Sequence, residues 1–196
     1  MAVQDDKILA AVVEILDADG YEAVQLREVA RRAHSSLATI YKRYSNRDEL
    51  IRAALQEWMD ENRFAGVAGL TKQPGESLYD GLIRMFRMLF EPWEQHPGML
   101  AAFFRVRSSP QGHELLHRGL DMVVPAGLEI LADADERFIS DIDAVVSSLV
   151  YGLLGRFAAG EISITDILPT LERTLFWMTA GYEASTPARR SRTAAR

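Results

Sequence analysis

The chain has 196 residues, of which 48% are hydrophobic, and a formal net charge of −6, so it can form one large or two small domains with a substantial core. It contains no cysteine, which excludes disulfide frameworks, thiolate zinc sites and cysteine nucleophiles. Its apolar runs are shorter than a bilayer requires, and acidic residues interrupt the apolar pattern near the N-terminus, unlike in a signal peptide. We therefore expect a soluble cytoplasmic protein with no membrane partner.

The charge is unevenly distributed along the chain. Between Leu26 and Arg47, six basic residues stand against the single acid Glu28, whereas residues 48–183 hold 21 acids and 11 bases. A local basic patch on an acidic body is a typical electrostatic footprint for phosphate groups. The alternative interpretation is an ordinary solvated charged face.

The N-terminal third has the hydrophobic spacing of short helices. Residues 5–18 predict an amphipathic helix that ends at Gly20. Two further short helices follow between Leu26 and Tyr44, and a tight polar turn at 34–36 separates them. Ser36 is placed to cap the second of these helices, and Ser45 or Asn46 to cap the next. Two short helices joined by a sharp turn are typical of a helix-turn-helix DNA-binding motif.

This segment resembles the DNA-binding half of the TetR family of transcriptional regulators. The matching residues are Gly20, Arg27, Val29, Ala30, Ala33, Ser36, Thr39, Ile40, Tyr41, Tyr44, Arg47 and Leu50. The chain departs from the family pattern at Gln25, His34, Ser35, Ala38 and Ser45. His34 stands where the family prefers glycine, but histidine is among the residues that tolerate a left-handed conformation. The resemblance covers the first third closely and the remainder only in length and helical layout.

The resemblance implies a DNA-binding domain at 1–47 and a larger helical domain for effector binding and dimerisation at 48–183. The outward positions of the second short helix and the basic residues around it are the predicted contacts with a double-stranded DNA operator. They are Arg27, Ser36, Leu37, Ala38, Thr39, Tyr41, Lys42, Arg43 and Arg47. A connecting helix at 47–64 begins the second domain and leads to a Gly-rich junction.

The rest of the chain is also helical in pattern, so the predicted fold class is all-α. Helices are expected at 77–94, 99–106 and 111–132, with Pro125 kinking the last or splitting it after Val124. Methionine and aromatic residues in this part suit a pocket for a small apolar effector, although an ordinary helical core contains the same residues. The predicted pocket residues are Met85, Met88, Phe103, Phe104, Met122 and Tyr151.

The last two predicted helices, 136–159 and 164–182, have more apolar surface than one subunit needs. One face of each can pack inside the subunit and the other against a second copy, which predicts a homodimer; a single ordinary core is the alternative. The predicted interface residues are Val145, Leu149, Gly152, Gly155, Leu171, Leu175 and Met178. Residues 184–196 contain four arginines and little to bury, and we expect a disordered basic tail.

One enzyme motif competes with this interpretation. His113-Glu114-Leu115-Leu116-His117 has the H-E-x-x-H spacing of a zinc hydrolase, and Glu136 is a conceivable third ligand. Three fixed letters arise easily by chance, and Pro125 interrupts the same segment. We therefore expect no catalytic residues, metal or cofactor. The sequence instead predicts a ligand-responsive repressor that binds a palindromic operator as a homodimer and is released by a small apolar effector. A zinc hydrolase and a helical adaptor are the alternatives.

Overall fold

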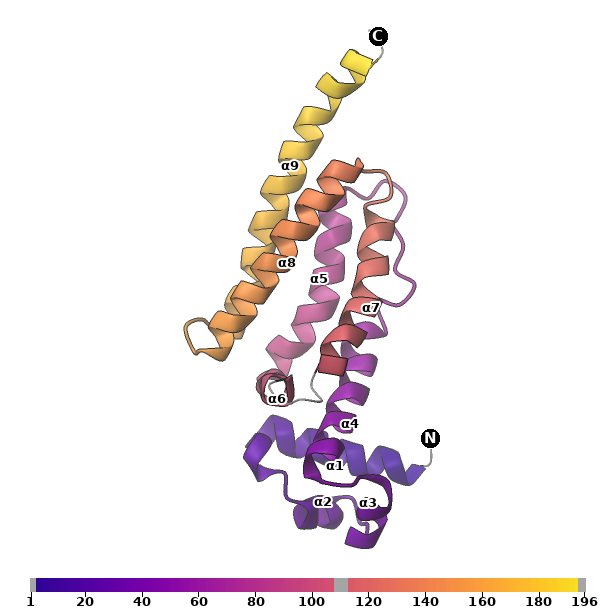
Figure 1. Ribbon diagram of the computed structural model, residues 1–196, viewed down its shortest axis with the longest axis vertical. Coiled ribbons are helices and arrows are strands. Elements are labelled where there is room, and N and C mark those ends of the chain that lie inside the picture. Colours follow the sequence, from indigo (N-terminus) through magenta and orange to yellow (C-terminus); the bar gives the residue numbers. More distant parts are fainter. Residues whose placement is uncertain (1–2, 108–112, 194–196) are drawn as a thin grey trace. The chain divides into compact units, whose positions relative to one another are not determined.

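The computed structural model describes the backbone of residues 3–107 and 113–193, and the side chains of residues 7–107, 115 and 118–185. Within these ranges the chain forms nine α-helices joined by short helical turns and loops, and no strand (Figure 1). The predicted all-α fold class is therefore confirmed.

Two compact units make up the chain. Unit 1 comprises Met1–Gly66 and Pro92–Val123, and unit 2 comprises Val67–Glu91 and Val124–Arg196. Unit 1 thus contains more than the predicted DNA-binding domain, because the connecting helix and a later segment pack with it. The division at residue 47 stays a prediction.

Unit 1 begins with three helices packed on one another: α1 (Val3–Asp19), α2 (Leu26–Arg32) and α3 (Leu37–Arg43). A short 3-10 helix, η1 (Tyr21–Ala23), follows α1, and α4 (Arg47–Met59) packs along α1. Apolar residues at helical spacing on all four α-helices turn inward and lose their contact with water, as the sequence pattern predicts. Residues without exposed surface in this core include Ile8, Val12, Ile15, Leu16, Val29, Ile40, Leu50, Ile51 and Leu55.

Two helices pass from one unit to the other, and each carries a proline close to the crossing. α5 (Leu78–Gln95) enters unit 1 at Pro92, and α7 (His113–Ile130) leaves it just before Pro125. A proline removes one backbone hydrogen bond and bends a helix without always ending it. Of the two alternatives predicted at Pro125, a kink or a split after Val124, the split does not occur, because α7 continues through Pro125. α6 (Pro97–Arg107) lies wholly in unit 1.

Unit 2 contains the two longest helices, α8 (Glu136–Ala158) and α9 (Ile167–Thr193), which lie antiparallel and in contact (Figure 1). Asp135 caps α8 by accepting a hydrogen bond from the Phe138 backbone N–H at 2.9 Å. The Phe138 and Tyr182 rings stack with centroids 4.1 Å apart, and the Tyr182 hydroxyl accepts from the Asp135 backbone N–H. These contacts join the start of α8 to the late part of α9.

The structure adds to one expectation from composition and corrects another. Among the described residues, α8 is long and apolar enough, by length and composition, to cross a membrane, although a core helix of a soluble protein meets the same criteria. Charged residues in the first two turns of α8 make its apolar stretch difficult to recognise from the sequence. Residues 184–193, expected to be disordered, continue α9 as helix. Extending an existing helix avoids the cost of nucleating a new one, which composition alone does not take into account.

Candidate nucleic-acid interface

The turn between α2 and α3 depends on His34. This residue adopts the left-handed conformation with φ of 49°, as predicted, and lies exposed. The reversal allows the Ser35 backbone N–H to donate to the Ala30 carbonyl at 2.9 Å, which closes the C-terminal end of α2. The chain can then begin α3 in a new direction while both helices share one core.

Ser36 fixes the start of α3. Its Oγ accepts a hydrogen bond from the Thr39 backbone N–H at 3.0 Å, and the two hydroxyl oxygens lie 2.9 Å apart, so the predicted cap is confirmed. Ile40 is fully buried and sets the inward face of the helix. The opposite face is therefore presented to solvent, with Tyr41 58% exposed.

The predicted DNA contacts differ in how they are placed. Arg27, Ser36, Ala38, Tyr41, Lys42 and Arg43 are exposed, whereas Leu37, Thr39 and Arg47 are half-buried. Within the described part of the chain, Arg27 and Lys42 form no ion pair, so their charges face solvent. Arg27 is exposed on α2, and Ala38, Tyr41 and Lys42 are exposed on α3.

Two other arginines of α2 are engaged within the protein. Arg31 and Arg32 both donate to the Glu28 carboxylate, with Nε to oxygen distances of 2.8 Å in each case, and Arg32 also pairs with Asp19 at 3.0 Å. Hydrogen bonds from Arg31 and then Arg32 lower the pKa of Glu28 to about 2. The positive charge that faces outward is therefore smaller than a count of the basic residues suggests.

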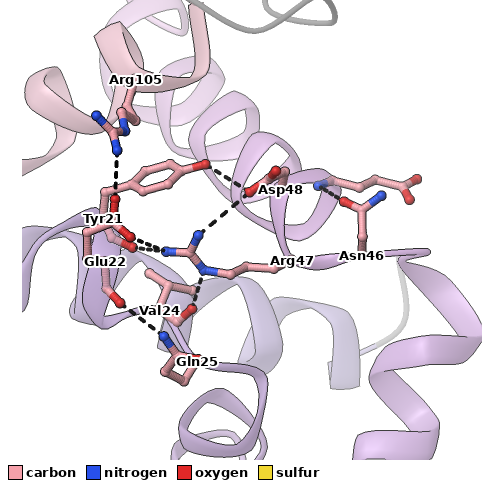
Figure 2. A network of polar contacts seen from close by, with 9 residues as sticks. Tyr21, Glu22, Val24, Gln25, Asn46, Arg47, Asp48 and Arg105 are labelled. Atoms are coloured by element: carbon pink, nitrogen blue, oxygen red, sulfur yellow. Dashed lines mark hydrogen bonds and ion pairs between the residues drawn. The ribbon is translucent and has the colours of Figure 1, made fainter.

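Arg47, at the first position of α4, is held by carbonyl groups of the preceding segment (Figure 2). Its Nε donates to the Val24 carbonyl at 2.6 Å, a second nitrogen donates to the Tyr21 carbonyl, and the guanidinium carbon lies 4.7 Å from the centre of the Tyr21 ring. The Tyr21 hydroxyl in turn donates to Asp48 Oδ1 at 3.0 Å. Arg47 thus anchors the start of α4, and its contact with DNA stays a prediction.

The same network extends to α6 within unit 1. Arg105 pairs with Glu22 at 2.9 Å, and Glu22 also lies 3.7 Å from Arg47 (Figure 2). At the other end of α6, His96 Nδ1 lies 2.6 Å from Asp17 Oδ2. α6 is therefore attached by polar contacts to both the end of α1 and the turn that follows it.

The predicted dimer residues lie on two different sides of α8 and α9. Val145, Gly152 and Gly155 are exposed, and Leu149 and Met178 are half-buried. Leu171 and Leu175 have no exposed surface, so their assignment to the interface is wrong: they belong to the core of unit 2. Phe176 and Trp177, which the prediction omitted, are instead 48% and 71% exposed. The two consecutive aromatic residues outside the main apolar stripe were the signal for them.

The predicted pocket residues are divided between the units. Met85, Met88 and Tyr151 belong to unit 2, whereas Phe103, Phe104 and Met122 belong to unit 1. Tyr151 is 47% exposed on α8, and Met85 and Phe103 are buried. This pocket stays a prediction. The sequence interpretation also missed Arg63, a buried arginine beside Trp93 in unit 1.

The zinc-hydrolase motif receives no support. The side chains of His113, Glu114 and His117 lie outside the described residues. Among the side chains that are described, no three His, Asp or Glu residues gather closely enough to hold a metal ion.

Comparisons with known proteins decide the family. Residues 8–54 match the family model described as bacterial regulatory proteins of the tetR family, and residues 75–178 match the tetracyclin repressor-like C-terminal domain. The chain belongs to the TetR family. This is a family of bacterial regulatory proteins.

Curated relatives match over parts of their length. A DNA-binding transcriptional repressor TetR of Mycobacteroides abscessus is 48% identical over 48 residues, 24% of this chain and 25% of the relative. The HTH-type regulator YvkB of Bacillus subtilis is 29% identical over 105 residues, 54% of this chain and 53% of the relative. The chain thus spans between a quarter and about half of the length of these relatives. A TetR-like regulator from Rhodococcus shares the fold, with a TM-score of 0.62 and 21% identity, over 92% of this chain and 98% of that one.

Proposed function

We propose that this regulator binds a two-fold symmetric DNA operator as a homodimer and that a small, largely apolar effector releases it. The observation that carries the proposal is the capped helix α3, which buries Ile40 and presents Ala38, Tyr41, Lys42 and Arg43. A helix of this kind after a tight turn places its N-terminal residues against base edges in the major groove.

The residues on this surface suit different contacts with DNA. Ala38 is small enough to let the helix backbone approach the bases, and Thr39 and Tyr41 offer hydroxyl groups for bases or phosphates. Arg27 on α2 and Lys42 on α3 offer positive charge that suits phosphate. Arg47 supports the surface indirectly by anchoring α4 to the carbonyl groups of Tyr21 and Val24.

In vitro selection from random duplexes tests the DNA-binding part of the proposal. The purified chain should enrich an inverted repeat, because a two-fold protein places two copies of α3 on symmetry-related half-sites. A selection that ends without sequence preference at moderate salt would refute it. Tyr41→Ala in the same selection should change the preferred bases without abolishing binding.

The homodimer is supported by the apolar surface that α8 and α9 leave open. A side chain built at Gly152 or Gly155 meets no atom within 4 Å, so this strip of α8 faces outward. Exposed apolar residues lie on both helices: Val145, Tyr151, Phe176 and Trp177. Soluble monomers rarely leave such apolar surface in water, and a second copy would cover it with the same two helices.

Light scattering combined with gel filtration measures the subunit number directly. The unmodified chain should be a dimer at micromolar concentration. Gly155→Leu adds a bulky side chain to the proposed interface and should give a folded monomer, whereas Gly155→Ala should remain dimeric. A wild-type monomer, or a Gly155→Leu protein that dimerises as tightly as the wild type, would count against this interface.

The effector is proposed to act through its different affinities for the free and the operator-bound regulator. An effector that weakens operator binding tenfold must itself bind the operator complex tenfold less tightly, a coupling of about 1.4 kcal/mol. Calorimetric titration of a candidate effector with and without operator measures the coupling, and equal affinities would exclude that compound as the signal.

A further inference from the structure

One face of α3 is directed away from the protein core. Ile40 is fully buried, so the residues two positions before and two positions after it lie on the opposite side of the helix. These residues are Ala38 and Lys42, and both are exposed. Tyr41, which is 58% exposed, follows Ala38 by three positions, so their side chains are neighbours on the helix surface. The outward surface of α3 therefore begins with a methyl group and an aromatic ring.

The hydroxyl groups at the start of α3 have partners within the protein. Ser36 Oγ accepts a hydrogen bond from the Thr39 backbone N–H at 3.0 Å, and the hydroxyl oxygens of Ser36 and Thr39 share a hydrogen bond at 2.9 Å. Thr39 is also half-buried. A contact between either hydroxyl and a base would have to share or replace these bonds, which makes both residues weaker candidates for reading bases.

The side chains that form paired hydrogen bonds with bases are absent from the start of α3. Arginine or lysine pairs with guanine, asparagine or glutamine with adenine, and an acid with cytosine, and residues 37–41 include none of these. The amides that flank the motif already have partners. Gln25 Nε2 donates to the Glu22 carbonyl at 3.1 Å. Asn46 Oδ1 accepts from the Glu49 backbone N–H at 2.9 Å.

The cationic side chains of the motif lie where contacts with phosphate are expected. Lys42 and Arg43 belong to the last turn of α3, and Arg27 lies on α2. In a helix-turn-helix motif the N-terminal residues of the second helix contact base edges, whereas the first helix crosses the phosphate backbone. Among the residues of α3, Ala38 and Tyr41 are therefore the ones best placed to contact bases.

We propose that Ala38 and Tyr41 recognise thymine through its C5 methyl group, so that each operator half-site contains at least one essential thymine opposite α3. This inference rests on the proposed operator binding and specifies how the bases are recognised. Thymine presents a methyl group in the major groove, and alanine and aromatic side chains make apolar contacts with it. Burial of that methyl group favours binding without a hydrogen bond from the protein.

The test removes the methyl group from the DNA. Uracil pairs with adenine as thymine does but lacks the C5 methyl group. Each thymine of the selected operator is replaced by uracil in turn, at the equivalent positions of both half-sites, and the affinity of the full chain is measured by fluorescence anisotropy. At the essential position, binding should weaken about fourfold for each half-site and about sixteenfold in total, the loss expected for one buried methyl group in each.

Two variants connect this effect to the side chains. Ala38→Gly and Tyr41→Ala each remove an apolar group from α3, so in at least one of them the ratio of affinities for thymine and uracil operators should fall towards one. Ala10→Gly makes the same exchange at an exposed position of α1 and should keep the wild-type ratio. Each ratio compares two duplexes bound by the same protein, so a loss of stability in a variant affects both affinities equally.

Two outcomes would overturn the inference: uracil at every thymine leaves the affinity unchanged, or both α3 variants keep the wild-type ratio. An inverted repeat that is bound equally well with thymine and with uracil would leave the proposed operator binding intact and refute only this inference. A selection that ends without sequence preference would instead refute the proposed operator binding, and this inference with it.

Discussion

Gly98 lies where α6 comes close to the backbone at the end of α1, and replacing it with alanine tests that contact. A Cβ at residue 98 would lie 2.6 Å from the Leu16 carbonyl oxygen and 2.8 Å from both the Cα and the carbonyl oxygen of Asp17. All three are backbone atoms and cannot rotate away, so α6 and the end of α1 must separate. Their separation would also strain the bond between His96 and Asp17.

Two opposing effects set the magnitude. Forcing an extra methyl group into a packed contact costs about 1–3 kcal/mol, whereas alanine gains up to about 1 kcal/mol over glycine in a helix. Gly98→Ala should therefore lower the free energy of unfolding by about 1–2 kcal/mol. For a chain of this size, each kcal/mol corresponds to roughly 2–4 °C in Tm.

Gly181→Ala is the matched control, because residue 181 lies within α9 and a Cβ there meets no atom within 4 Å. The control should be neutral or slightly stabilising. Unfolding by urea, followed by tryptophan fluorescence and by circular dichroism at one protein concentration, measures both variants. If Gly98→Ala is as stable as Gly181→Ala, the close approach of α6 to α1 does not exist as described.

Three further predictions concern charged residues. Lys42→Ala should weaken binding to all DNA sequences and reduce the slope of log affinity against log salt by about one unit. The control Lys72→Ala removes an ion pair with Asp133 in unit 2 and should change neither the affinity for DNA nor the salt slope. Arg47→Ala should lower the free energy of unfolding, measured with urea, by about 1.5–3 kcal/mol, because two carbonyl groups lose a charged donor. Arg47→Lys should recover only part of this loss, because one ammonium group cannot reproduce the planar pair of donors of a guanidinium. The pKa of Glu28 is lowered from 4.5 to about 2, so the stability that its carboxylate contributes is present above pH 4.5 and is lost as the pH falls towards 2. The difference in unfolding free energy between wild type and Glu28→Gln should therefore shrink over that interval. A difference that does not depend on pH would contradict this.

The DNA-binding helices could be predicted because local chemistry specifies them. Ser36 and Asn46 cap their helices with their own side chains, and His34 permits the left-handed turn, so each boundary is visible in a few neighbouring residues. The spacing of apolar residues then sets the inward face of each helix. The role of Arg47 could not be predicted in this way, because its partners Tyr21 and Val24 lie 26 and 23 residues earlier.

Helices with two apolar faces limited the prediction of the other sites. In α9 the sequence shows both faces but not which one packs inside the subunit, so Leu171 and Leu175 were assigned to the wrong side. Arg63 was missed for a related reason. A regular repeat of 3.6 residues directs it to solvent, and only the five-residue step from Met59 to Phe64 indicates the turn of π-helix, η2 (Asp60–Phe64), that buries it.

Hydroxyl-radical footprinting of the selected operator tests the central claim most directly, because it shows how many copies of α3 contact one duplex and where. Two equivalent sets of protected positions should appear, related by a two-fold axis and separated by about one helical turn of DNA, or a multiple of it. Lys42→Ala should weaken both sets equally. A single asymmetric region of protection, or protection that does not depend on the operator sequence, would contradict a homodimer that recognises a palindrome through α3.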